Sequence, residues 1–137
     1  MKKLFLLFIA VFAFILTGCT TSYSKDSFKG NLEKNGYTVD VNPTIANLDK
    51  TKLEGLQTVL YAYNKDDVGI LLFIFDSTDN VNKLTEGSTV SETVSMIMRW
   101  GKDHAKSGNN EFGSVNNVLY SGDKDARKAA GIRLATD

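Results

Sequence analysis

The sequence predicts an α+β domain in which an antiparallel sheet carries helices on one face. Segments rich in β-branched and aromatic residues alternate along the chain with segments of helical period. One segment, residues 70–75, is apolar without interruption and has the length of a strand. Such a strand is typical of the centre of a sheet, with cover on both faces, so we expect it to be the middle of the core.

A short helix is expected at the start of the domain, over residues 26–35. Phe28 and Leu32 are four residues apart and therefore share one face of that helix. Ser24 or Asp26 can cap its first turn, because their side-chain oxygens can accept from free backbone N–H groups.

Three strands and one ambiguous segment follow this helix. Alternating apolar and polar residues at 37–41 predict a half-buried strand. Residues 45–56 have a weak helical pattern, and a loop with one turn of helix is the alternative. The clearest strands are 58–63 and 68–76, which a hairpin connection at 65–67 joins.

Two helices are expected next. Ser77 or Thr78 caps the first, which carries Val81 and Leu84. The second covers 90–104, where Thr89 and Glu92 have the spacing of a capping box. Its expected inward stripe consists of Val90, Val94, Ile97, Met98 and Gly101.

The last part of the chain predicts a loop, a strand and a helix. Residues 106–113 are polar and glycine-rich, which indicates a loop. Residues 115–120 are expected to form the last strand, in which Asn116 and Asn117 make either a bulge or the turn of a small hairpin. Residues 121–123 can cap a terminal helix. The apolar residues expected on that helix are Ala126, Ala129, Ala130 and Ile132.

Two topologies are compatible with this order of elements. With a helix at 45–56, the order β-α-β-β-α-β is the split βαβ arrangement of ferredoxin-like sandwiches. With a loop there, the strands form a meander with helices at one end.

The N-terminal region has the organisation of a signal peptide. Lys2 and Lys3 precede an uncharged apolar run, residues 4–16. This run is shorter than the about 20 residues that a membrane-spanning helix needs. The small residues Thr17 and Gly18 then lead into Cys19, the only cysteine.

The sequence Leu16-Thr17-Gly18-Cys19 resembles the lipobox of bacterial lipoproteins. The resemblance implies cleavage after residue 18 and a mature Cys19 that carries diacylglycerol and an amide-linked acyl chain such as palmitate. It also implies a lipid anchor on the extracytoplasmic face of the cell membrane, with the outer membrane as an alternative in a cell with two membranes. A lipidated tether, 19–25, and a single domain, 26–137, would follow.

Scattered positions of the mature chain are also similar to small bacterial lipoproteins of unassigned function. That resemblance brings no catalytic or ligand residues to this sequence. Besides the apolar hairpin, the positions are Phe28, Leu32, Gly36, Tyr37, Val39, Asn117, Val118 and Tyr120.

Charge and residue types argue against several functions. The 16 basic and 16 acidic residues balance, and loss of Lys2 and Lys3 leaves a small acidic excess, so no nucleic-acid partner is expected. His104 is the only histidine, and the lipidation of Cys19 that the resemblance implies would remove the only thiol, which leaves no ligand set for zinc. The acidic pairs at 76–79 and 123–125 lack the spacing of a calcium loop. We therefore expect no catalytic residues, no metal and no cofactor.

Trp100 is the remaining candidate for a functional contact. It lies off the expected inward stripe of its helix, so it is either a partly buried flank of the core or an exposed anchor for a partner. The sequence as a whole favours a membrane-anchored, non-catalytic lipoprotein that binds another cell-envelope component. The alternative is a small-ligand or peptide-binding lipoprotein that is accessory to a transporter.

Overall fold

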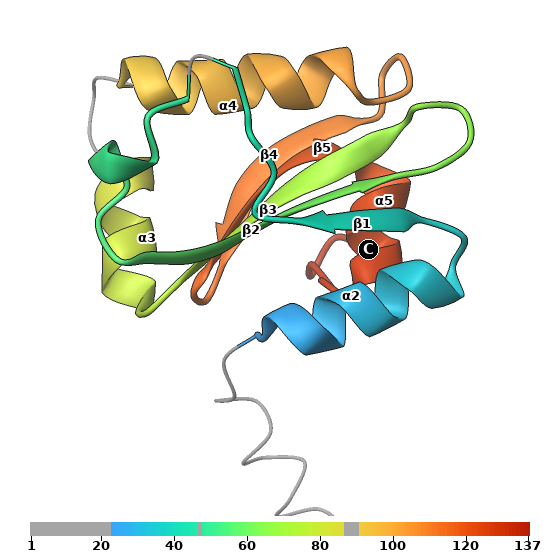
Figure 1. Ribbon diagram of the computed structural model, residues 1–137, viewed down its shortest axis with the longest axis horizontal. Helices are drawn as coiled ribbons and strands as arrows, with labels where there is room; N and C mark the ends of the chain where they lie inside the picture. The colour runs from blue at the N-terminus through green and yellow to red at the C-terminus, as the bar shows by residue number, and fades with distance from the viewer. Residues whose placement is uncertain (1–22, 47, 87–90) are drawn as a thin grey trace, which may run out of the picture.

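The computed structural model describes residues 23–46, 48–86 and 91–137, which form three layers (Figure 1). A five-stranded sheet lies between α2 and α5 on one face and α3 and α4 on the other. The elements in chain order are α2 (Lys25–Lys34), β1 (Thr38–Val41), the 3-10 turn η1 (Lys50–Lys52), β2 (Leu56–Tyr63), β3 (Gly69–Phe75), α3 (Thr78–Thr85), α4 (Glu92–Asp103), β4 (Asn110–Val115), β5 (Val118–Asp123) and α5 (Lys124–Ala130).

The sheet has the strand order β1-β2-β3-β5-β4, and every neighbouring pair is antiparallel. The predicted α+β class with an antiparallel sheet is confirmed. β3 is the central strand, and all seven of its residues are buried. Leu72, for example, pairs with Leu60 on one side and with Tyr120 on the other. The prediction that the uninterrupted apolar segment forms the middle of the core is confirmed as well.

The prediction that helices cover one face of the sheet is wrong. Ile70 and Leu72 belong to the core under α2 and α5, whereas Leu71 and Phe73 belong to the core under α3 and α4. Successive side chains of a strand point to opposite faces. A strand that is apolar at every position therefore requires helices on both sides.

The split βαβ arrangement is not formed, because the segment between β1 and β2 contains only the one-turn η1 in its described residues. The alternative of a loop with one turn of helix is the correct one. Ile45, Leu48 and Leu53 from this segment pack against the core under α3 and α4. We call the described residues between β1 and β2, 42–46 and 48–55, the strap. The strap lies across this face of the sheet, and its apolar residues are spaced to suit their burial there.

The loop predicted at 106–113 is only partly present, since its last residues belong to the edge strand β4. Asn116 and Asn117 form the turn of a β4–β5 hairpin, which was the second alternative. The predicted strand 115–120 therefore covers the last residue of β4, the turn and the first residues of β5. β4 is difficult to predict from the sequence because it contains several polar residues. An edge strand can contain them because it is buried on fewer sides, and none of the residues of β4 is fully buried.

Helix starts follow the predicted capping chemistry in most places. The Ser24 and Ser77 hydroxyls accept from backbone N–H groups at the starts of α2 and α3, and the Asp123 carboxylate does so at α5. α4 is capped by Ser91, whereas the predicted capping residue Thr89 lies outside the described residues, as does Val90.

Two predicted helical positions need correction. Within α4, Val94, Ile97 and Gly101 are buried as expected, but Met98 is 41% exposed. Met98 lies on the flank of the buried stripe, where the sheet does not reach it. α5 ends at Ala130, so Ile132 is buried beyond the helix.

The last residues of the predicted tether, 23–25, belong to the folded domain, and residues 19–22 lie outside the described residues. Lys25 already belongs to α2, and the ring of Tyr23 stacks on Phe28 with 5.2 Å between ring centroids. The side chain of Tyr23 packs against the core under α2 and α5. The domain therefore includes residues from Tyr23 onward, because an aromatic ring gains more from burial than from exposure.

Candidate functional site

The lipobox residues Leu16, Thr17, Gly18 and Cys19 lie outside the described residues, so their arrangement remains a prediction. Among the helices that the structure describes, none combines the length and the apolar character needed to cross a membrane.

Trp100 belongs to an aromatic cluster at the C-terminal end of α4, together with Tyr61, Tyr63 and His104. The Tyr61 ring meets it edge-on with 4.9 Å between centroids, and the His104 ring stacks on it at 3.9 Å and 11°. Nδ1 of His104 lies 2.9 Å from the carbonyl oxygen of Trp100. Stacking and this hydrogen bond keep the His104 side chain half-buried. Its position at the end of a helix would by itself suggest a side chain that faces solvent.

Two adjoining hollows border Trp100, and we call the surface that they form the Trp100 surface. The inner hollow, of about 50 Å³, is lined by the strap residues and by apolar side chains of α4 and β3. The outer hollow, of about 240 Å³, is shallower and is rimmed by Arg99 and Asp103. The Trp100 surface comprises Ile45, Ala46, Leu48, Met96, Arg99, Trp100 and Asp103, over a floor of Leu71 and Ile97.

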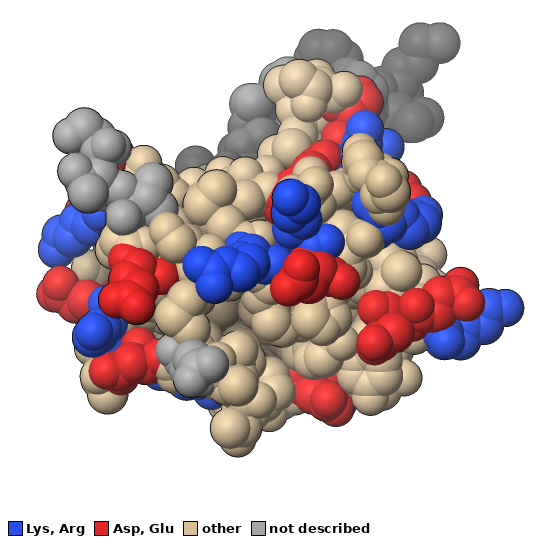
Figure 2. Space-filling model, turned by 90° about the horizontal axis from the view of Figure 1, so that it is seen from above, with Lys and Arg blue, Asp and Glu red and all other residues tan. Residues whose placement is uncertain are grey.

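Carboxylates lie near the aromatic cluster without forming a broad acidic patch. Burial raises the pKa of the Tyr61 hydroxyl, and the nearby carboxylates of Asp67 and Asp40 raise it further. Figure 2 views the molecule from the side of α4 and shows basic and acidic side chains interspersed among neutral ones. This distribution lacks the single-sign field that steers a polyanion to a surface.

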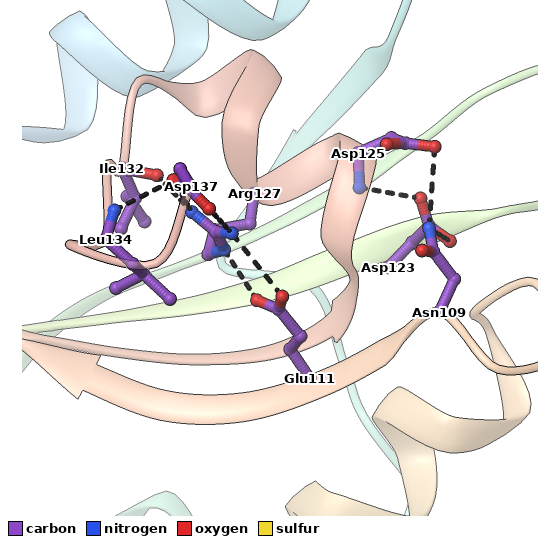
Figure 3. A network of polar contacts seen from close by, with 8 residues as sticks. All are labelled: Asn109, Glu111, Asp123, Asp125, Arg127, Ile132, Leu134 and Asp137. Atoms are coloured by element: carbon purple, nitrogen blue, oxygen red, sulfur yellow. Dashed lines mark hydrogen bonds and ion pairs between the residues drawn. The ribbon is translucent and has the colours of Figure 1, made fainter.

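A buried ion pair fixes the C-terminal segment (Figure 3). Arg127 has no exposed surface, and its guanidinium donates to Glu111 at 2.6 Å and to Asp137 at 2.6 and 2.8 Å. It also donates to the carbonyl oxygen of Ile132 at 2.6 Å. Hydrogen bonds from Arg127 hold the pKa of the Asp137 carboxyl well below its usual range. Every group of this network has a partner, which is typical of a structural role.

A second polar network connects the 106–109 loop to the start of α5 (Figure 3). The buried Asp123 carboxylate accepts from the backbone N–H of Lys106, from the side-chain amide of Asn109 and from the backbone N–H of Asp125. Nζ of Lys106 donates to Asp125 at 2.6 Å, which lowers the pKa of that carboxylate. These contacts explain both acidic residues: Asp123 caps α5 and holds the 106–109 loop, and Asp125 pairs with Lys106 of that loop. In the part of the chain that the structure describes, no three His, Cys, Asp or Glu residues are grouped to hold a metal ion.

A polar groove lies between α2 and α5 on the opposite face of the sheet. Its volume is about 510 Å³, and it is wide open to solvent. The residues that line it are Asn31, Asn35, Asp125, Lys128, Ala129, Gly131 and Arg133.

Sequence reasoning identified Trp100 but missed its neighbours. The spacing of Trp100 and His104 by four residues on one helix was a usable signal for their contact. Tyr61 and Ile45 carry no such signal, because their contact with Trp100 depends on how α4 lies over the sheet and on the path of the strap. The structure confirms that Trp100 is a partly buried flank of the core, and its ring also borders an open hollow. A contact between Trp100 and a partner stays a prediction.

No family model matches the chain, and no match to it is found among curated proteins or solved structures. The function must therefore be argued from the surface itself.

Proposed function

We propose that this protein is a lipid-anchored, non-catalytic component of the bacterial cell envelope that binds a protein partner through the Trp100 surface. The anchor is inferred from the lipobox that ends at Cys19. The observation that carries the binding role is the half-buried Trp100 ring beside an apolar hollow. Half-buried aromatic side chains next to small pockets are typical anchors of protein interfaces.

The size of the inner hollow indicates the chemistry of the partner. A volume of about 50 Å³ is far below the roughly 300–1,000 Å³ of small-molecule sites. It suits the end of one aliphatic side chain. Arg99 and Asp103 on the outer rim offer one charge of each sign, which favours a partner with a mixed polar rim.

A small-ligand or peptide-binding role is the second candidate, and the groove between α2 and α5 favours it by its size. That groove is open and lined mostly by polar side chains, whereas typical ligand sites are enclosed and mostly apolar. We therefore prefer the Trp100 surface.

Catalysis receives no support from Asp125 and Asp137, two carboxylates whose pKa is lowered. The pKa of Asp137 is lowered by its pairing with Arg127, and the pKa of Asp125 is lowered by its pairing with Lys106. Structural ion pairs explain both shifts, and neither carboxylate borders the Trp100 surface.

The binding role can be tested by photo-cross-linking in cells, with the reactive residue placed at position 103 on the rim. We expect one dominant protein adduct, and Trp100→Ala should reduce it roughly thirtyfold, the effect of losing an anchor worth about 2 kcal/mol. Met98→Ala is the matched control, because Met98 is exposed on the same helix but does not line the hollows. It should leave the adduct unchanged.

Two further variants separate binding from folding and from anchoring. Arg99→Glu changes only the exposed rim and should weaken the adduct without changing thermal stability. Cys19→Ala should move the protein out of the membrane fraction. Equal adduct yields from the wild type, Trp100→Ala and Arg99→Glu would contradict the binding role, and an unchanged membrane fraction for Cys19→Ala would contradict the anchor.

A further inference from the structure

The N-terminal end of the domain is held at one corner of the sheet by the side chain of Asn117. Its Oδ1 accepts from the backbone N–H of Tyr23 at 3.1 Å, and its Nδ2 donates to the carbonyl oxygen of Tyr23 at 3.2 Å. The side chain thus pairs with both main-chain groups of Tyr23, as a neighbouring strand would. Asn117 is only 5% exposed, so this pairing is shielded from competing water.

The same asparagine is tied to the last residue of the central strand. Nδ2 of Asn117 also donates to the carbonyl oxygen of Phe75 at 3.2 Å, and the Phe75 N–H donates to the Asn117 carbonyl oxygen at 2.8 Å. Tyr23 is therefore fixed to the C-terminal end of β3 and not merely to a mobile turn.

The opposite end of β3 carries the aromatic cluster. The N–H of Gly69, the first residue of β3, donates to the carbonyl oxygen of His104 at 2.8 Å. A strand of this length spans about 20 Å at ~3.3 Å per residue. The corner at Asn117 and the backbone of His104 thus lie at the two ends of β3. Figure 1 shows in addition that α2 and α4 cover opposite faces of the sheet.

We infer that the Asn117 end of the sheet faces the lipid bilayer and that the Trp100 surface is held at the end away from it. This inference rests on the proposed lipid anchor at Cys19. Three residues lie between Cys19 and Tyr23, and the four Cα–Cα steps from one to the other reach at most about 14 Å. The start of α3 follows directly after Phe75, so it shares the end that faces the lipid.

Tryptophan fluorescence in vesicles tests this orientation, because Trp100 is the only tryptophan. The full lipidated protein is placed in phosphatidylcholine–phosphatidylglycerol vesicles that contain a lipid with a nitroxide headgroup. In a Trp100→Phe background, Thr78→Trp reports from the start of α3, and Asp66→Trp reports from the β2–β3 hairpin. Both positions are exposed, and neither is close to Cys19 in sequence.

The expected result is several-fold stronger quenching for Thr78→Trp than for Asp66→Trp, with Trp100 of the wild type quenched as little as Asp66→Trp. Adding Asn117→Ala should reduce this difference, because Tyr23 loses its side-chain partner. Equal quenching at both positions in vesicle-bound protein would overturn the orientation and leave the anchor intact. Failure of the lipidated protein to bind vesicles would overturn the anchor and the orientation together.

Discussion

At the scale of the residue, Arg127 shows why a local pattern can mislead. An arginine in the short polar helix α5 is expected at the surface, yet its side chain is completely buried. Its carboxylate partners, Glu111 and Asp137, lie 16 residues before it and 10 residues after it in the sequence. No periodicity connects these three positions, so only the fold brings them together.

The pairing of Arg127 with Asp137 predicts a dependence of stability on pH. The pKa of Asp137 is lower in the folded protein than the about 3.9 of an unfolded chain. Its contribution is therefore present above that value and is lost as the pH falls through the folded pKa. We expect Asp137→Asn to lower the melting temperature at neutral pH, and we expect the gap to the wild type to narrow below about pH 4.

Thermal unfolding followed by circular dichroism across this pH range checks the prediction. Asp66→Asn is the matched control, since Asp66 is exposed at a hairpin tip and its side chain has no ion pair among residues 23–46, 48–86 and 91–137. A gap between Asp137→Asn and the wild type that stays constant with pH would show that Arg127 does not control this carboxylate.

At the scale of the element, α4 lies unusually close to β5 because Gly101 has no side chain. A methyl group at this position would overlap the Ser121 hydroxyl and lie 2.8 Å from the backbone nitrogen of Gly122. Ser121 in turn donates to the carbonyl oxygen of Ile97 at 2.7 Å. The sequence placed Gly101 in the buried stripe, although it could not indicate which strand the helix would contact.

Gly101→Ala should therefore push α4 away from the sheet and reduce the free energy of unfolding by about 1–3 kcal/mol, the usual cost of overpacking. Denaturant unfolding measures the effect. Gly30→Ala is the same substitution in α2, where nothing lies within 4 Å of the added methyl. It should increase stability by about 0.5–1 kcal/mol. A similar change in both variants would contradict the close contact of α4 with β5.

Elements with strong local chemistry were predictable, and those that depend on tertiary packing were not. Ser24 and Ser77 cap helices as expected, since a cap needs only its own turn. β4 was not predicted because an edge strand needs little apolar surface. The strap has a weak helical pattern because it buries Ile45, Leu48 and Leu53 at irregular intervals. For the candidate site, Trp100 could be singled out as an unusual residue, while Tyr61 becomes its neighbour only through the way α4 lies over the sheet.

At the scale of the whole molecule, the composition of β3 already implied three layers. A strand with no polar side chain requires cover on both faces, yet the predicted topology assigned every helix to one. The sequence already showed that an entirely apolar strand conflicts with helices on a single face. It did not show which helices lie on the second face. The short connections leave open which face each helix covers, and that choice depends on the packing of the completed core.

The central place of β3 also predicts how protection from solvent is distributed. β3 is paired on both sides and is buried throughout, whereas β1 is paired only with β2 and is largely exposed. In hydrogen–deuterium exchange, we expect the amides of β3 to exchange on the order of a hundredfold or more slowly than those of β1, because they open only with global unfolding. Equal exchange in the two strands would contradict a core organised around β3.

The pairing of β3 with β5 also has a consequence for the time at which the fold can form. Synthesis proceeds from the N-terminus, so the residues of β2 and β3 have been made well before Val118–Asp123. During that interval β3 has an open edge and no polar side chain, a combination that invites pairing with other unfinished chains. The nascent protein is protected from such association only once its last strand has been added beside its third.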